Sequence, residues 1–168
     1  MGRRSGRIVP GKTFSHLDRA GRARMVDVSA KRPTLRTAVA AGCVTLSPEA
    51  LRRLVGGRLA KGDVLSVARV AGIQAAKRTG ELIPLCHPLG VDWVDIEFEV
   101  RPPERIEIRA TARVAARTGV EMEALTAVTI AALTVYDMCK SVDRTITLGP
   151  FRLESKTGGR SGPFRRRP

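Results

Sequence analysis

The sequence is poor in the features that mark secreted, membrane and metal-binding proteins. Its three cysteines, Cys43, Cys86 and Cys139, are an odd number and form no C-x-x-C pair, which argues against a disulfide framework or a zinc knuckle. No apolar run approaches the roughly 18 residues that a membrane span needs, and the N-terminal residues include no apolar signal segment. We therefore expect a cytoplasmic protein with reduced thiols, no metal site and no membrane association.

Aromatic residues make up only 4% of the chain, which bears on its positive charge. The 168 residues include 30 Lys and Arg against 16 Asp and Glu, a formal net charge of +14 that suits a nucleic-acid or phosphate partner. However, the basic residues crowd the two ends, with hardly an aromatic side chain among them to stack on bases. We interpret residues 1–24 and 158–168 as solvated tails and residues 25–157 as a single domain.

Two runs of alternating apolar and polar residues predict a β-hairpin. Residues 94–100 alternate apolar with acidic side chains, and residues 106–114 alternate apolar with polar or charged ones, so each run has one wet face. The intervening Pro102-Pro103-Glu104 cannot continue a ladder but can turn, which makes the two strands antiparallel.

Further segments complete an α+β, ferredoxin-like pattern. Residues 146–153 form a third strand candidate whose phase changes at its Gly-Pro pair, as a bulge or kink would cause, and residues 38–46 form a weaker one. Helices are expected over residues 63–78 and 121–140, with a short one over residues 48–54. This order of elements is that of a split β-α-β fold, an antiparallel sheet with its helices packed on one face.

The helix expected over residues 121–140 carries two further signals. Thr118-x-x-Glu121 at its start is a possible capping box. From residue 124 to residue 139 the helix is apolar nearly all round. In a domain this small, a helix that covers one sheet face should keep a wet side, so we expect its outer side to pack on another subunit.

Charged residues at helix ends could carry chemistry, although each also has an ordinary structural interpretation. Lys61 precedes the N-cap candidate Asp63, where a lysine can meet an anion, but a plain surface lysine is the commoner case. Asp137 and Lys140 are three residues apart on one helix face and can pair. Such pairs are commonly structural, yet a carboxylate beside an ammonium can also tune both groups for proton transfer.

Glu121 and Glu123 lie at the opposite end of that helix, where acidic residues usually serve only to complement the helix dipole. Fourteen residues separate Glu123 from Asp137, which corresponds to about 21 Å along a helix. If both ends are functional, either they contact opposite ends of a long substrate or the pocket is shared between subunits.

Two loops add weaker candidates. His87, flanked by Cys86 and by prolines on both sides, is held in a stiff segment, but a lone histidine is more often structural, and adjacent Cys and His make a poor metal site. The basic, glycine-rich run from Lys156 to Gly162 could wrap phosphates or could be a flexible tail. It lacks the strand, spacing and helix of a P-loop, which excludes ordinary nucleotide hydrolysis.

Taken together, these segments resemble the cyclic pyranopterin monophosphate synthase family, the molybdenum cofactor biosynthesis protein C family. The resemblance covers roughly residues 15–162 and rests on six blocks in order: Met25-Val26-Asp27-Val28-Ser29, Lys61-Gly62-Asp63-Val64, Ala71-Gly72-Ile73-Gln74-Ala75-Ala76-Lys77, Ile83-Pro84-Leu85-Cys86-His87-Pro88-Leu89, Thr118-Gly119-Val120-Glu121-Met122-Glu123-Ala124-Leu125 and Tyr136-Asp137-Met138-Cys139-Lys140. One departure is Arg160, where the family pattern has lysine, which changes the geometry of an anion contact.

The resemblance implies a cyclising phosphorus–oxygen lyase with no cofactor and no metal-ligating residues. It converts 3′,8-cyclo-7,8-dihydroguanosine 5′-triphosphate to cyclic pyranopterin monophosphate and diphosphate, and it acts after the radical cyclase that makes its substrate. The resemblance also implies a homohexamer, a trimer of dimers, with active sites at subunit interfaces. Carried onto this chain, the catalytic residues are Asp137, Lys140 and Lys61, and the substrate-binding residues are Leu85, Cys86, His87, Glu121, Met122, Glu123, Lys156 and Arg36.

Two alternatives come from other classes. Ferredoxin-like sheets can bind RNA, but such a sheet displays exposed aromatic residues, whereas the hairpin strands offer only Trp93 near one end and Phe98 on the apolar face. An inactive homologue that persists as an assembly partner is the other alternative, and the presence of all the family's charged site residues argues against it.

Overall fold

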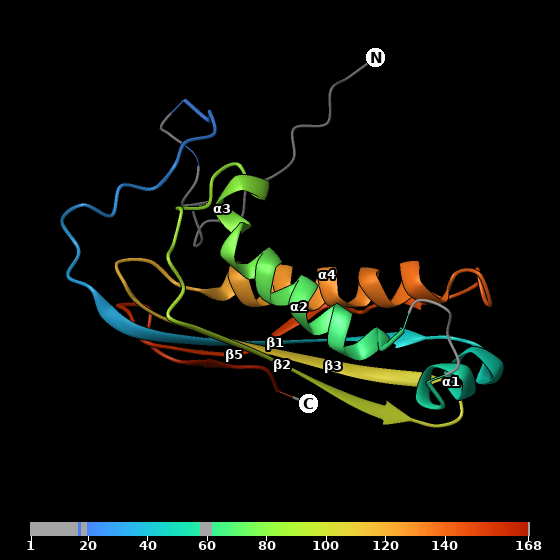
Figure 1. The fold of residues 1–168 in the computed structure, drawn as a ribbon. Coiled ribbons are helices and arrows are strands. Elements are labelled where there is room, and N and C mark those ends of the chain that lie inside the picture. Colours follow the sequence, from blue (N-terminus) through green and yellow to red (C-terminus); the bar gives the residue numbers. More distant parts are fainter. Residues whose placement is uncertain (1–16, 18–19, 58–61, 168) are drawn as a thin grey trace, which may run out of the picture.

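Alternating side chains and two long apolar helices give this chain a two-layer structure, with a sheet on one side and helices on the other (Figure 1). The computed structural model describes residues 17, 20–57 and 62–167. The elements in chain order are β1 (Thr34–Thr45), α1 (Pro48–Val55), α2 (Val64–Lys77), α3 (Thr79–Leu82), β2 (Trp93–Arg101), β3 (Arg105–Ala116), α4 (Glu121–Cys139), β4 (Thr147–Leu148), β5 (Arg152–Thr157) and β6 (Phe164–Arg165).

The sheet order confirms the ferredoxin-like α+β prediction. Neighbouring strands follow the order β2-β3-β1-β5-β6, with β4 also pairing with β1, and every pair is antiparallel. The predicted hairpin is β2 and β3, which pair from Trp93 with Arg113 to Arg101 with Arg105. Helices α2 and α4 lie side by side over one face of this sheet (Figure 1).

The strand expected over residues 146–153 is two strands. The chain leaves β4 at Leu148, passes through a cis Gly149-Pro150 peptide and re-enters the sheet as β5, which runs on to Thr157. The change of phase expected at Gly149-Pro150 is thus the break between β4 and β5, and a separate register shift within β5 leaves Glu154 without a partner in β1. Two residues assigned to the C-terminal tail, Phe164 and Arg165, pair with β5 as β6.

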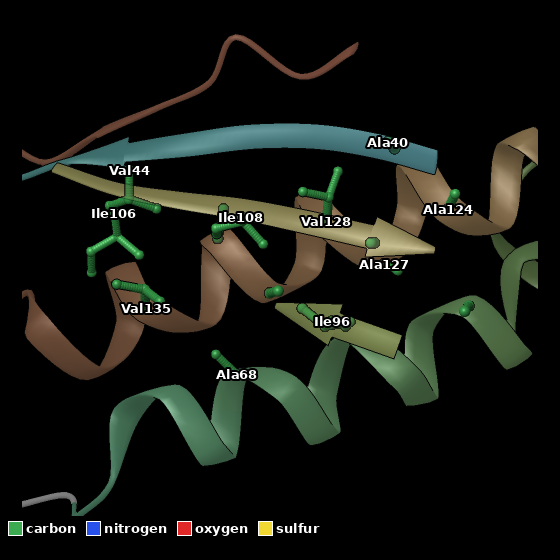
Figure 2. Close-up of a cluster of buried hydrophobic side chains, with 14 of the residues drawn as sticks. Ala40, Val44, Ala68, Ile96, Ile106, Ile108, Ala124, Ala127, Val128 and Val135 are labelled. Atoms are coloured by element: carbon green, nitrogen blue, oxygen red, sulfur yellow. The ribbon is translucent and has the colours of Figure 1, made fainter. Parts of the chain in front are cut away.

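Small side chains let α4 approach both the sheet and α2. Figure 2 shows Ile106 and Ile108 of β3 on the side of the sheet that faces Val128 and Val135 of α4, whereas Ile96 of β2 packs against Gly72 of α2, and all of these residues are buried. Alanines at positions 124, 127, 131 and 132 fill the remaining turns of α4 and are fully buried. Where the two helices are closest, a Cβ added to Gly72 of α2 would lie 2.8 Å from the backbone oxygen of Ala127. The helical layer is therefore built around contacts that exclude larger residues.

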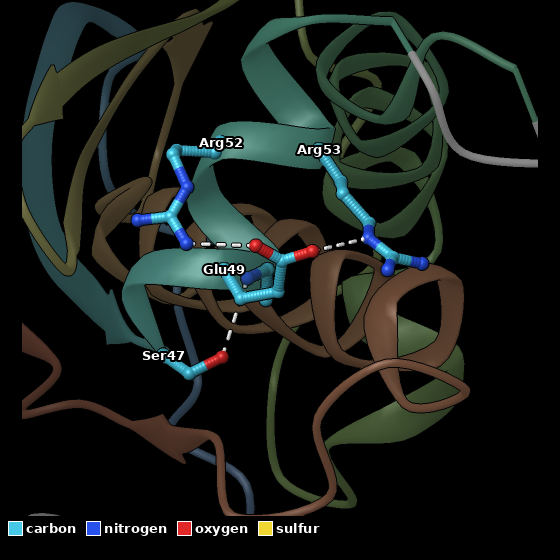
Figure 3. A network of polar contacts seen from close by, with 5 residues as sticks. Ser47, Glu49, Arg52 and Arg53 are labelled. Carbon is cyan, nitrogen blue, oxygen red and sulfur yellow. Dashed lines mark hydrogen bonds and ion pairs between the residues drawn. The ribbon is translucent and has the colours of Figure 1, made fainter.

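The N-terminal ends of the helices match the sequence predictions only in part. Asp63 caps α2, accepting a 3.1 Å hydrogen bond from the Ser66 amide. Ser47 caps α1 in the same way, and the exposed Glu49 carboxylate binds Arg52 and Arg53 at 2.7 Å each (Figure 3). The ion pairs of α1 are exposed to solvent, which screens them, so they contribute little to the stability of the fold.

The predicted capping box of α4 is wrong. The N-cap residue is Val120, and no side chain caps the helix. The carboxylate of Glu121 instead folds over Gly119 and faces the Lys156 ammonium, 3.8 Å away. Since the carboxylate is engaged there, it does not reach back to the position that a capping box requires.

Among the helices of the described residues, α4 is long and apolar enough to cross a membrane by length and composition alone, but half of this apolar stretch is buried within the fold. A helix that is buried in the core of a domain commonly has this length and composition. The outer side of α4 keeps Leu133 49% exposed, and Val67 and Val70 of α2 are 46% and 55% exposed.

Candidate active site

The N-terminal end of α4 borders a cavity that collects most of the predicted substrate-binding residues. Its volume is about 600 Å³, and its lining includes Leu85, Cys86, His87, Glu121 and Met122. The first three come from the loop after α3, and the last two from the first turn of α4. Residues more than 30 positions apart in the chain therefore meet at one opening.

The loop that carries His87 is held on both sides. Gly80 of α3 supports it from behind, since a Cβ there would lie 2.8 Å from Cα of Pro88. His87 Nε2 lies 2.8 Å from the backbone oxygen of Val26. A carbonyl oxygen only accepts hydrogen bonds, so Nε2 carries the proton and Nδ1 is left for a different partner. This contact also ties the segment before β1 to the cavity.

Glu123 is the most unusual group at this end. Its side chain is 1% exposed, and Oε2 has no hydrogen-bond partner among the described residues. Burial raises the pKa of the Glu123 carboxyl, and the nearby Glu121 adds to the effect. Burial and the neighbouring Glu123 also raise the pKa of the Cys86 thiol, so both groups favour their neutral forms.

Two positively charged side chains of the sheet, Lys156 and Arg36, lie near the N-terminal end of α4. Lys156 of β5 faces Glu121 at 3.8 Å and donates a short hydrogen bond to Ser161 Oγ. Arg36 of β1 donates to the backbone oxygens of Ala116 and Arg117, at 3.0 and 3.1 Å.

The glycine-rich turn that follows β5 packs directly on the Arg36 guanidinium. At Gly159, with a positive φ of 79°, an added Cβ would lie 2.8 Å from Cζ of Arg36. Arg36 thus fixes the loop before α4 and the turn after β5 in one place.

Asp137 and Lys140 lie at the opposite end of α4. Lys140 Nζ is 2.6 Å from Asp137 Oδ1, and both side chains are about half exposed, at 51% and 56%. The hydrogen bond from Lys140 to Asp137 raises the pKa of the ammonium, which keeps it protonated. At about 1.5 Å per residue, this pair is roughly 21 Å from Glu123 along the helix.

The structure thus divides the predicted site residues into two groups. The N-terminal group of α4 comprises Leu85, Cys86, His87, Glu121, Met122, Glu123, Lys156 and Arg36. The C-terminal group comprises Asp137 and Lys140. The third predicted catalytic residue, Lys61, lies outside the described residues.

Sequence reasoning missed Val26, Val28 and Lys31 as lining of the cavity. The only available signal was that residues 25–29 form one of the family-like blocks, to which no role was given. Within the described ranges, no group of three or more His, Cys, Asp or Glu side chains is arranged to hold a metal ion.

Comparison with known proteins places these residues in a shared family. A sequence model of the MoaC family matches residues 25–159. Cyclic pyranopterin monophosphate synthase 3 of Mycobacterium tuberculosis is 60% identical over 153 residues, which cover 91% of this chain and 86% of that protein. The cyclic pyranopterin monophosphate synthase of Desulfitobacterium hafniense is 56% identical, covering 90% of this chain and 93% of that protein.

A third relative, the cyclic pyranopterin monophosphate synthase of Pelotomaculum thermopropionicum, is 56% identical over 155 residues, 92% of this chain and 91% of that protein. The matched region includes the cavity, the Asp137–Lys140 pair and nearly all of the sheet. The resemblance inferred from the six sequence blocks is therefore confirmed, and the chain belongs to the MoaC family.

Proposed function

We propose that this chain catalyses the cyclic pyranopterin monophosphate synthase step of molybdenum cofactor biosynthesis. The observation that carries the proposal is identity of 56% to 60% with synthases of that name over about nine tenths of the chain. The substrate is the cyclised dihydroguanosine triphosphate, and the products are the pterin monophosphate and diphosphate. The enzyme is a cyclising phosphorus–oxygen lyase that follows the radical cyclase and works in the cytoplasm.

The two groups of residues suit different parts of this reaction. Ring opening and reclosure need proton transfers, for which the Asp137 carboxylate and the Lys140 ammonium form a ready donor and acceptor pair. The raised pKa of Lys140 favours its use as a proton donor or as a fixed positive charge. Closing the cyclic phosphate and releasing diphosphate develop negative charge, which a lysine ammonium can stabilise.

The N-terminal group of α4 suits recognition of a neutral, polar base. Glu123 in its protonated form donates one hydrogen bond and accepts another, and its Oε2 has no partner in the described part of the chain. His87 is oriented by Val26 with one ring nitrogen left to contact a ligand. Lys156 and Arg36 supply positive charge beside these groups, where the triphosphate can bind.

We propose further that each active site is shared by two subunits of a homohexamer built as a trimer of dimers. The distance of about 21 Å between the two ends of α4 is too long for one small-molecule pocket in one subunit. Pairing two subunits brings the N-terminal group of one beside the C-terminal group of its partner. The exposed Leu133, Val67 and Val70 provide apolar surface on the helical layer for such an assembly.

The direct test supplies the purified protein with the cyclised dihydroguanosine triphosphate and measures diphosphate and pterin together. GTP in place of the substrate is the matched control, because it carries the same triphosphate without the cyclised base. The proposal expects both products from the cyclised substrate in equal amounts and neither from GTP. Release of phosphate or diphosphate from both compounds would instead indicate a general nucleotide hydrolase.

A further inference from the structure

A second large hollow lies on the open face of the sheet, away from the helical layer. Its volume is about 1330 Å³, and it lies between β3, β5 and the C-terminal segment. The C-terminus lies on the side of the sheet that faces away from α2 and α4 (Figure 1). Arginines dominate the lining of this hollow, here called the arginine groove: Arg109, Arg152, Arg165, Arg166 and Arg167, with one acidic residue, Glu154.

Strand register explains how residues so far apart in sequence form one groove. Arg109 of β3 and Arg152 of β5 are both cross-strand partners of Ala41 in β1. Directly paired residues point to the same face, so the two arginines flank a small alanine. Because neighbouring strands are about 4.8 Å apart, the backbones of β3 and β5 lie about 10 Å apart, with the small side chain of Ala41 in β1 between them.

The short strand β6 adds the third side of the groove. Arg165 pairs with Ser155, and Ser155 in turn pairs with Val39 of β1, so Arg165 points to the same open face. Arg166 fixes this segment, because its backbone amide donates to the backbone oxygen of Glu154 at 2.8 Å and its Nε donates to the backbone oxygen of Leu153 at 3.0 Å. The arginines are therefore held on ordered backbone rather than on a free tail.

Acidic groups offset this concentration of charge only in part: Glu97, Glu99 and Glu107 line the adjoining hollow, which shares Arg109 and Arg152 with the groove. Glu154 is bound to Arg152 at 2.6 Å. Glu97 is the cross-strand partner of Arg109 but forms no ion pair with it, and Arg165 and Arg167 have no acidic partner among the described residues. Several guanidinium groups thus face one concave surface, where the field of like charges is focused.

We propose that the arginine groove binds a condensed phosphate anion, of the class of inorganic diphosphate or triphosphate. Guanidinium groups match phosphate oxygens in paired hydrogen bonds, and several of them spaced along a groove suit a chain of phosphates better than a single one. No residue that lines the cavity of the candidate active site lines this groove, although Lys156, whose ammonium faces Glu121, borders the groove as well. The inference goes beyond the proposed function and does not depend on it.

The test titrates inorganic triphosphate into the full-length protein by calorimetry, which gives affinity and the number of sites per subunit. Three proteins are compared: the unmodified chain, Arg165→Ala/Arg167→Ala, and Arg52→Ala/Arg53→Ala. The control pair removes the same charge from the exposed surface of α1, outside the groove (Figure 3). We expect the groove variant to lose at least about tenfold in affinity at one site per subunit, while the control variant binds as the unmodified chain does.

Equal binding by the groove variant and the unmodified chain overturns the proposal. A change in oligomer mass of the groove variant, measured by light scattering, also overturns it, because the groove is then a contact between subunits. Should the double variant fail to fold, Arg109→Gln on β3 tests the same site without touching β6, with the same expected loss. Synthase turnover by the groove variant provides an independent check that the candidate active site is intact.

Discussion

Glu123 Oε1 lies 3.9 Å from Cys86 Sγ in the interior of the fold, where both groups favour their neutral forms. The carboxyl group comes from the first turn of α4, a position where acidic residues are usually exposed to solvent. Its burial raises the pKa of the carboxyl and so favours the protonated form, which can donate a hydrogen bond.

This relationship predicts how stability depends on pH. The pKa of Glu123 is raised in the folded state above its ordinary value of 4.5. Between these two pKa values the folded protein holds a proton that the unfolded chain has lost. The contribution of Glu123 to the free energy of unfolding therefore falls as pH rises from about 4.5 through the folded pKa. Glu123→Gln, which is permanently neutral and similar in shape, should gain stability relative to the unmodified protein over that range. Denaturant unfolding of both proteins from pH 4 to pH 8 measures this gain. A difference in the free energy of unfolding that stays constant across the range would contradict a protonated Glu123.

A shared active site predicts that two inactive variants restore each other. His87→Ala removes a group at the N-terminal end of α4, and Lys140→Ala removes one at the C-terminal end. If each site takes one end from each subunit, mixed dimers contain one intact site, and random mixing should recover about a quarter of full activity. The variants are unfolded together, refolded and assayed, with each variant refolded alone as the control. No recovery in mixtures shown to contain both chains places both residues in one subunit.

Close contact between α2 and α4 predicts that Gly72→Ala destabilises the fold. The added Cβ would lie 2.8 Å from the backbone oxygen of Ala127, which cannot move without shifting α4. Overpacking of this kind costs about 1–3 kcal/mol. Gly90→Ala is the matched control, because nothing lies within 4 Å of its added Cβ. Chemical denaturation measures the free energy of unfolding of Gly72→Ala and Gly90→Ala. Equal stability of the two variants would show that α2 and α4 separate easily.

Asp143 predicts a second pH dependence, of opposite sign. Its carboxylate accepts hydrogen bonds from the Ser47 amide at 2.7 Å and from the amide and hydroxyl of Thr145 at 2.8 and 2.7 Å. These bonds lower its pKa from 3.8 to about 2. The stability it contributes is thus complete above about pH 4 and is lost as pH falls through 2.

Asp143→Asn should therefore be less stable at neutral pH, by about 1–3 kcal/mol, because the Ser47 amide loses its charged acceptor. The difference from the unmodified protein should shrink below pH 4. Acid unfolding followed by circular dichroism measures both effects. Parallel acid transitions for the two proteins would exclude Asp143 as the titrating group.

The sequence predicted the fold well because its main signals are local. Alternation along residues 94–100 and 106–114 identifies strands with one buried face, and the apolar residues of α4 identify a core helix. The position of β6 could not be predicted in this way, because Phe164 and Arg165 show no alternation and depend on pairing with β5. The start of α4 at Glu121 was predicted correctly, but the role of the Glu121 carboxylate was not, because it faces Lys156, which lies 35 residues away in the chain.

The candidate site was predicted mainly by family resemblance rather than by physical pattern. Nothing in the local sequence distinguishes Glu123, which is buried, from Glu121, which is partly exposed, because burial depends on how α4 meets the loop of Cys86. The contact of His87 with Val26 depends on the path of the chain before β1. Periodicity within one segment carries no information on contacts of this kind.

Comparison of the unmodified protein with Lys140→Ala tests the synthase assignment most directly. Diphosphate and pterin are measured from the cyclised dihydroguanosine triphosphate, with Lys77→Ala of α2 as an exposed-lysine control. Because water screens the half-exposed Asp137–Lys140 pair, its loss should change the stability of the protein little, so the variant should stay folded. The account predicts turnover by the unmodified and control proteins and a loss of about 100-fold or more in Lys140→Ala. A folded, unmodified protein without turnover, or a fully active Lys140→Ala, would contradict it.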